Sequence, residues 1–72
     1  MNNLDAHDFG SAIRSARKAR LLTQQQLADL SGMGITFVSN LERGKPVSEL
    51  GEAIQVALTA GLNISLQDRM DA

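Results

Sequence analysis

Residues 23–44 of the 72-residue chain read TQQQLADLSGMGITFVSNLERG, and their caps, glycines and apolar spacing predict how the chain folds. Thr23 is followed three positions later by a glutamine, the pattern of a capping box at the start of a helix. Gly32 ends this helix. Gly34 is a suitable N-cap for a second helix, and Gly44 ends the second helix. Because only three or four residues join the two helices, they cannot lie antiparallel. The stretch therefore predicts two short helices that cross steeply.

The apolar spacing of these two helices indicates which sides face each other. We expect Leu27 and Ala28 of the first to pack against Val38 and Leu41 of the second. The small side chain of Ala28 lets the two helix axes approach closely. The second helix then turns a different set of side chains outward, and this set consists of Ile35, Thr36, Ser39 and Asn40.

This outward set is suited to contact with the edges of DNA bases. A recognition helix presents its N-terminal residues to the major groove. Asn40 can bond adenine through N6 and N7, and Thr36 can use its hydroxyl or its methyl group. Ile35 offers only apolar contact, which suits a thymine methyl group, although it can equally be an exposed or partner-facing hydrophobic residue. We expect Phe37 to pack against the protein, and the set predicts a site with A/T-rich determinants.

Other polar residues near the two helices are predicted to hold phosphates or to hold the fold together. Gln24, with the free N–H groups at the start of the first helix, can clamp a phosphate. Arg43 and Lys45 follow the second helix and can reach the same DNA backbone. We interpret Arg17 and Glu42 differently, as a partly buried ion pair that is structural and contacts no base.

Charge is segregated along the chain, whose formal net charge is −1. Residues 11–46 hold six basic and two acidic side chains, a net +4, whereas residues 1–10 carry −2 and residues 47–72 carry −3. A positive middle can meet phosphates, and acidic ends suit solvent or a basic partner. The alternative is a chance scatter of surface charge.

Two further helices are expected on either side of this stretch. The first has Asp8 as its N-cap and runs to about Arg20. The second starts at Ser48 and ends at Gly61, and Pro46 separates it from the preceding helix. The positions expected to face the core are Phe9, Ile13 and Ala16 in the first of these helices and Leu50, Ile54, Ala57 and Leu58 in the second.

Beyond the last helix the apolar period changes to two. Leu62, Ile64 and Leu66 alternate with polar residues, as in a half-buried strand. A lone strand leaves its backbone N–H and C=O groups unpaired, and the same strand of a second subunit can pair with them. We therefore expect a two-stranded antiparallel ribbon across a homodimer, with a disordered tail as the alternative.

Length and composition exclude several classes of protein. We expect one domain over residues 1–72, with its core at about 9–61 and a C-terminal strand and tail at 62–72. The chain has no cysteine, and His7 is its single histidine, which leaves no thiolate chemistry and no multi-histidine metal site. The N-terminus is acidic and polar, unlike a signal peptide, and no run approaches the ~20 apolar residues of a membrane span. We expect a soluble, cytoplasmic protein that is not an enzyme and has no cofactor and no small-molecule substrate.

The segments LTQQQLADLSG and GITFVSNLERGK resemble the Cro and lambda-repressor type of helix-turn-helix, also called the XRE family, and the resemblance covers residues 9–61. It implies an all-α, compact bundle of four to five helices that binds double-stranded operator DNA as a dimer. It also implies that Gln24 clamps a phosphate and that Arg17 pairs with Glu42. The family's base-contacting positions correspond to Ile35, Thr36 and Asn40.

Two positions depart from the family pattern. Leu21 stands where the family usually has glycine, so we expect a leucine under strain in a left-handed conformation. Ile35 stands where the family usually has glutamine or arginine, which puts direct polar recognition there in doubt.

Within the family, FVSNLERGKPVSELGEAIQVALTAGLNISL is similar to the HipB-type antitoxins. That resemblance implies an autorepressor encoded beside a HipA-type serine/threonine kinase toxin, which it binds and restrains. One alternative is a stand-alone or phage-type repressor, and another is a protein-interaction module that has lost DNA binding. The neighbouring gene discriminates between the first two.

Overall fold

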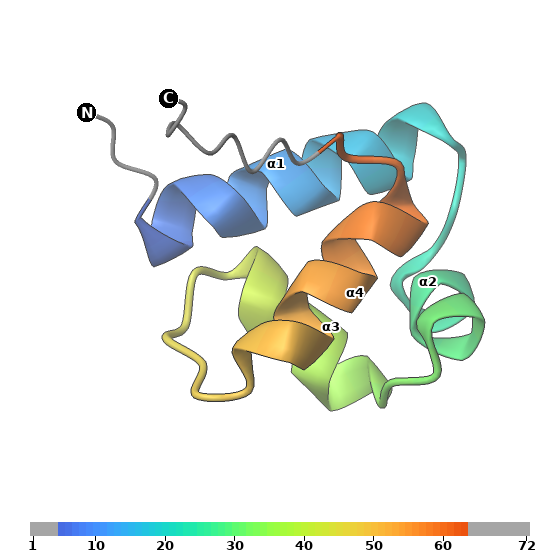
Figure 1. The fold of residues 1–72 in the computed structure, drawn as a ribbon. Coiled ribbons are helices and arrows are strands. Elements are labelled where there is room, and N and C mark those ends of the chain that lie inside the picture. Colours follow the sequence, from blue (N-terminus) through green and yellow to red (C-terminus); the bar gives the residue numbers. More distant parts are fainter. Residues whose placement is uncertain (1–4, 64–72) are drawn as a thin grey trace, which may run out of the picture.

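The computed structural model describes residues 5–63, which form four α-helices (Figure 1). They are α1 (Ala6–Ala19), α2 (Gln24–Ser31), α3 (Ile35–Glu42) and α4 (Leu50–Ala60). α1 packs against α3 and α4, and α2 packs against the same two helices. No strand occurs within this part of the chain, and none of its helices is long and apolar enough to cross a membrane. The predicted all-α architecture is confirmed.

The core lies where the four helices meet. The predicted inward residues of the central stretch, Leu27, Ala28, Val38 and Leu41, are all buried. Burial of a Leu, Ile or Val side chain stabilises a fold by roughly 1.5–3 kcal/mol. The packing of these four side chains against one another therefore favours one angle between α2 and α3. The buried core as a whole consists of Ile13, Leu27, Ala28, Val38, Leu41, Ala53, Val56, Ala57 and Ala60.

Every helix ends in the same hydrogen-bonded motif. The first or second residue after the helix takes a positive φ, and the N–H of the residue that follows it bonds to the carbonyl five positions back, which is a Schellman ending. Within residues 5–63, three of the four positive-φ residues are glycines. The fourth is Leu21, with φ of 61°. The left-handed leucine expected from the sequence is therefore present.

α1 begins one turn earlier than predicted, so the assignment of Asp8 as its N-cap is wrong. The cap is Asp5, whose carboxylate accepts a hydrogen bond of 2.8 Å from the backbone N–H of Asp8. Two aspartates three residues apart both offer a cap, and the earlier one adds a turn to the helix. Asp8 then lies in the first turn, where its negative charge meets the positive end of the helix dipole.

α4 also differs from the prediction, in its start and in the side that it buries. It begins at Leu50, with Glu49 as its N-cap, two residues after the predicted start at Ser48. Leu50 and Leu58 are 63% and 53% exposed, and Ile54 is half-buried. The buried side carries small residues instead, and these are Ala53, Val56, Ala57 and Ala60. Small side chains let α4 lie close to α1 and α2. The prediction placed the leucines in the core because of their size and did not anticipate this close approach.

The predicted C-terminal strand falls mostly outside the described residues, since Ile64 and Leu66 lie beyond them. Leu62 is described and is not part of a strand. Its N–H bonds to the carbonyl of Ala57 at 3.0 Å in the ending of α4, and its half-buried side chain packs against the core. For Leu62 the strand assignment is therefore wrong, because the helix ending uses the N–H that a ribbon would pair.

Candidate nucleic-acid interface

α2 and α3 form a helix-turn-helix whose start is fixed by a reciprocal cap. The Thr23 hydroxyl accepts a hydrogen bond of 3.0 Å from the backbone N–H of Gln26. The side-chain oxygen of Gln26 accepts one of 2.8 Å from the N–H of Thr23. The predicted capping box is thus confirmed. Gly32 ends α2 at φ of 75°, and Gly34 is the N-cap of α3 without a side-chain bond.

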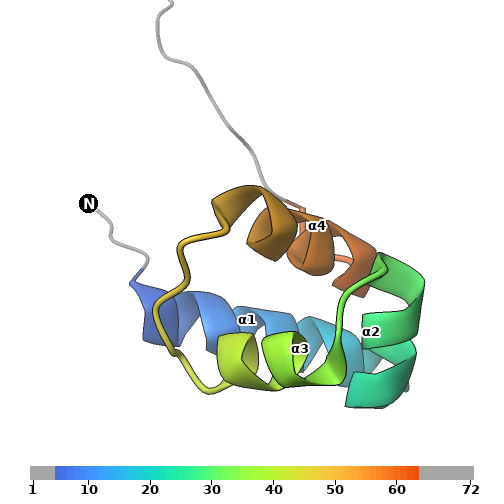
Figure 2. The ribbon, with the colours of Figure 1, turned by 90° about the horizontal axis from the view of Figure 1, so that it is seen from below.

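The outer side of α3 carries the four residues predicted to contact bases. Ile35 is 41% exposed, Thr36 is exposed, and Ser39 and Asn40 are half-buried. Figure 2 shows α3 along one edge of the molecule, beside α2. We call this surface of Ile35, Thr36, Ser39 and Asn40 the α3 face. Its side chains are accessible to a ligand.

Arg43 lies close to one member of the α3 face. Its Nη2 donates a hydrogen bond of 3.4 Å to Oδ1 of Asn40, one turn earlier. A carboxamide oxygen has two lone pairs, so this oxygen can accept a second bond. The contact leaves the Asn40 amide group available, with its donor and its remaining acceptor on the same accessible surface.

The N-terminus of α2 lies next to the C-terminus of α3 and is held there by a side chain. Nε2 of Gln24 donates a hydrogen bond of 3.1 Å to Oε1 of Glu42. The amide group has a second hydrogen, which this bond does not use. A helix also leaves its first N–H groups without intrahelical partners, and the capping box occupies only part of them. This end of α2 therefore offers several donors and the positive end of a helix dipole, the features that bind anions.

Arg17 and Glu42 form a buried, two-pronged ion pair. Arg17 Nε lies 2.7 Å from Glu42 Oε2, and Nη2 lies 3.0 Å from Oε1. The two side chains are only 10% and 2% exposed. Arg17 Nη1 also donates a bond of 2.8 Å to the carbonyl of Leu22, just before α2. One carboxylate thus joins α1, the entry to α2 and the end of α3.

The remaining basic side chains of residues 5–63 are exposed. Arg43 and Lys45 follow α3 directly, as the sequence predicted, and both are exposed. Three more basic residues are exposed along and just after α1, and these are Arg14, Lys18 and Arg20. Since Arg17 is neutralised by Glu42, these five side chains carry the positive charge of the central segment. Among residues 5–63, no three His, Asp or Glu side chains are grouped so that they could hold a metal ion.

Sequence reasoning missed the bond between Gln24 and Glu42 and the bond from Arg17 to Leu22. Both link residues that no local motif connects. The sequence offered only an indirect indication of these bonds. Glu42 was expected to be partly buried with Arg17, and a buried carboxylate accepts several hydrogen bonds. Phe37 is half-buried against the core, in agreement with the expectation that it packs on the protein.

Comparison with known proteins agrees with this geometry. A family model described as "Helix-turn-helix" matches residues 13–68. A curated relative, the "Uncharacterized HTH-type transcriptional regulator y4mF" of Sinorhizobium fredii (strain NBRC 101917 / NGR234), is 39% identical over 59 residues. The match covers 82% of this chain and 78% of the relative. No solved structure matches the chain.

Proposed function

Because this chain belongs to the XRE-type helix-turn-helix family of DNA-binding transcriptional regulators, we propose that it is a sequence-specific repressor that inserts α3 into the major groove of operator DNA. The observation that carries the proposal is the α3 face, whose polar and apolar groups are accessible while the opposite side of α3 is buried. Asn40 recognises adenine, and Thr36 and Ser39 contact neighbouring bases. Ile35 packs on a thymine methyl group.

The donors next to α3 fix its position on the duplex. The N-terminus of α2, with Gln24 held against Glu42, binds one phosphate. The exposed Arg43 and Lys45 bind the same DNA backbone past the end of α3. Such contacts position a protein without specifying sequence. Phosphate contacts on both sides of α3 hold the α3 face against the base edges.

A repressor of this kind acts as a homodimer on two half-sites. Half-sites bound by paired recognition helices lie roughly 34 Å apart, one turn of the duplex. Residues after Leu62, including Ile64 and Leu66, supply part of the dimer contact in this proposal. A small domain buries a limited share of its surface alone, so a second copy also adds stability. A repressor that binds chromosomal DNA acts in the cytoplasm, on the nucleoid, and this is the location that we propose for the protein.

The resemblance to HipB-type antitoxins supports a more specific role. In it, the protein represses its own operon and binds a HipA-type serine/threonine kinase toxin encoded beside it. A stand-alone regulator fits the fold and the similar transcriptional regulator equally well. Affinity purification of the tagged protein from its host separates the two, because only the antitoxin retains a kinase-like partner encoded by the adjacent gene. A protein-interaction module that has lost DNA binding remains the alternative outside this class.

The proposal is tested by footprinting the purified protein on the DNA upstream of its own gene. A repressor of its own operon protects a short, symmetric site there and ignores unrelated DNA of equal length. Protection of every fragment with equal affinity contradicts sequence-specific recognition. An absence of protection at low salt, where phosphate contacts are strongest, contradicts DNA binding altogether.

A further inference from the structure

One side of α1 carries positive charge next to the end of α3, and we propose that it binds the phosphates of one DNA strand. It consists of Ser11, Arg14 and Lys18, which are all exposed, and we call it the α1 flank. Their spacing of three and four residues places them in one row along the helix. Residues 9–28 contain no acidic side chain, so the two charges have no neutralising neighbour along the helix. The inference rests on the proposed function, because it extends the same contact with DNA.

Gly10 holds the backbone of α1 directly against the end of α3. A Cβ at this position would overlap the carbonyl oxygen of Leu41 and would lie 3.0 Å from that of Glu42. Farther along α1, the ion pair between Arg17 and Glu42 joins the same two helices. Arg14 comes four residues after Gly10 and three before Arg17, so it is a neighbour of both on the helix surface. The α1 flank therefore borders the line along which α1 meets α3.

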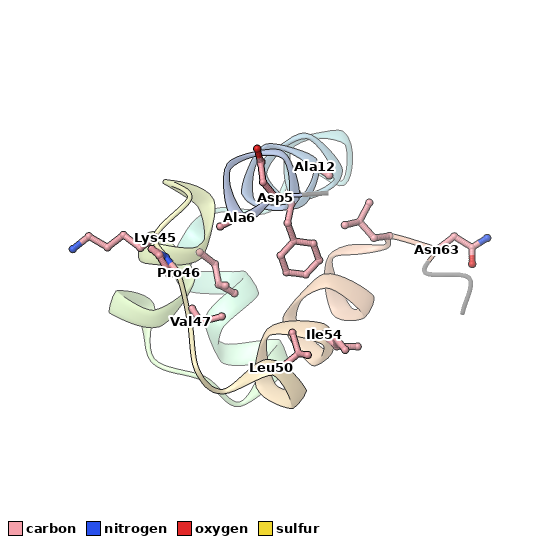
Figure 3. A pocket seen from close by; sticks show the side chains of 12 residues that line it. Asp5, Ala6, Ala12, Lys45, Pro46, Val47, Leu50, Ile54 and Asn63 are labelled. Carbon is pink, nitrogen blue, oxygen red and sulfur yellow. The ribbon is translucent and has the colours of Figure 1, made fainter. Parts of the chain in front are cut away.

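The core lies on the other side of this line. Ile13, which also lies between Gly10 and Arg17 on the helix, is buried there. On that side an apolar groove separates α1 from α4, and Figure 3 shows Ala6 of α1 and Ile54 of α4 in its lining. Figure 2 shows α1 and α3 together at the edge of the molecule opposite to α4. The α1 flank is thus on the side of the molecule that carries the α3 face.

One end of the α1 flank lies near the phosphate site proposed at the start of α2. Arg17 Nη1 donates a bond of 2.8 Å to the carbonyl of Leu22, two residues before α2 begins at Gln24. Lys18 is the next residue after Arg17, and its carbonyl accepts a hydrogen bond from the turn that leads to α2. A DNA strand held at the N-terminus of α2 therefore passes close to Lys18.

The other end of α1 lies beside the second proposed phosphate site. A Cβ on Gly44 would be 2.9 Å from Cα of His7, so the first turn of α1 contacts the turn that carries Arg43 and Lys45. Figure 3 shows the Lys45 side chain pointing away from α4. From residue 7 to residue 18 the helix rises about 16 Å. The α1 flank thus lies between the two phosphate sites, so one strand can contact all three groups of donors.

Arg20 has the same charge but a different position, which makes it a matched control. It is exposed, and its Nε lies 2.8 Å from the position that a Cβ of Gly61 would take, at the end of α4. Its side chain therefore lies toward α4 and not toward the α3 face. The structure divides the three exposed basic residues of this region into two that face the DNA strand and one that does not.

The salt dependence of DNA binding tests the α1 flank. Arg14→Gln and Lys18→Gln each weaken binding to operator and to a random duplex by the same factor, about fivefold to tenfold at 0.1 M salt, and each lowers the slope of log K against log salt by about 0.9. Arg20→Gln changes the net charge equally but leaves both quantities as in the wild type. Circular dichroism verifies that all three variants keep their helices. A slope for Arg14→Gln or Lys18→Gln equal to that of Arg20→Gln overturns the proposal.

Ethylation interference tests the position of the contact on DNA. Ethylation removes the charge of one phosphate, so a phosphate whose ethylation weakens the wild type but not Arg14→Gln is the one that Arg14 contacts. We expect it on the same strand as the phosphates assigned in this way by Gln24→Ala and Lys45→Ala, and between them. An Arg14 phosphate outside that interval, or a pattern unchanged from that of the wild type, overturns the proposal.

The proposed function and the α1 flank fail in different ways. A wild type that protects its operator, with equal slopes for the Arg14 and Arg20 variants, contradicts the α1 flank alone. A wild type that binds random DNA as tightly as its own upstream region contradicts sequence-specific repression, whereas the slopes on random DNA still test the α1 flank. A wild type that binds no DNA at low salt contradicts both.

Discussion

Gln24 and Glu42 are joined by a hydrogen bond of 3.1 Å that connects the first residue of α2 to the last residue of α3. The same carboxylate receives two bonds from Arg17, whose own Nη1 holds the carbonyl of Leu22. The proposed phosphate clamp and the proposed recognition helix are therefore fixed to each other through one buried group. Glu42 is a positioning residue in this account and contacts no DNA itself.

The buried pair dominates the stability of this network. Arg17→Met and Glu42→Leu each leave one charge buried without its partner, so each lowers the free energy of unfolding by about 3–5 kcal/mol. A variant with both substitutions recovers most of the lost free energy of unfolding, because two apolar side chains fill the space of the ion pair. Urea unfolding curves followed by circular dichroism measure all three variants. A double variant as unstable as the sum of the singles contradicts this explanation.

The positioning role of Glu42 is separable from its effect on stability. In the wild type, Gln24→Ala weakens operator binding by about 1.5 kcal/mol, because a hydrogen bond to a charged phosphate is lost. In the folded double variant with Met at 17 and Leu at 42, the same change has little further effect, since Gln24 has already lost its support. Fluorescence anisotropy with labelled operator measures the four affinities. Equal losses in both backgrounds show that Gln24 acts without Glu42.

Lys45 is expected to contribute to affinity without contributing to specificity. Lys45→Ala weakens binding to operator and to random DNA by the same factor, and it lowers the slope of log K against log salt by about 0.9. Titrations at several salt concentrations give this slope. A loss confined to the operator would assign Lys45 to base recognition.

Asn40 is expected to behave in the opposite way. Asn40→Ala loses about 1–3 kcal/mol of discrimination at one base pair per half-site, because the adenine contact is lost. Its binding to random DNA changes little. The measurement compares operator variants mutated at each position, and a uniform loss of affinity at all positions removes Asn40 from the base-contacting set.

Leu21 offers a stabilising substitution. It holds a φ of 61° and is 89% exposed, so it gains little from packing. A left-handed leucine costs roughly 1–2 kcal/mol, which glycine avoids. The greater conformational freedom that glycine gives the unfolded chain offsets part of this gain in stability. Leu21→Gly therefore raises the free energy of unfolding by about 0.5–1 kcal/mol. Leu30→Gly is the matched control: it is similarly exposed but inside a helix, and it lowers stability by about 1 kcal/mol.

Features that depend on neighbouring residues were predictable from the sequence. The cap at Thr23, the endings at Gly32 and Gly44 and the inward pair Val38 and Leu41 all follow from short spacings, and the structure has each of them. The N-cap of α1 was not predictable in this way, because Asp5 and Asp8 offer the same chemistry three residues apart. Rules based on neighbouring residues alone do not distinguish the two aspartates as N-caps.

Features that depend on distant contacts were not predictable. Leu50 and Leu58 were assigned to the core because of their size, whereas the space beside α1 and α2 admits only alanines and Val56. The bond from Gln24 to Glu42 spans two helices and needs the crossing angle before it can be inferred. On the site itself, the pattern indicated the side of α3 that is exposed, but not the network behind it.

In the proposed complex with operator DNA, the α3 face meets the edges of DNA bases. The most direct measurement is an NMR titration of the 15N-labelled protein with its operator. Insertion of α3 into the major groove produces the largest amide shifts at residues 35–40 and at Gln24, with further shifts at Arg43 and Lys45. Large shifts confined to α4, with the amides of α3 unchanged at saturation, would contradict it.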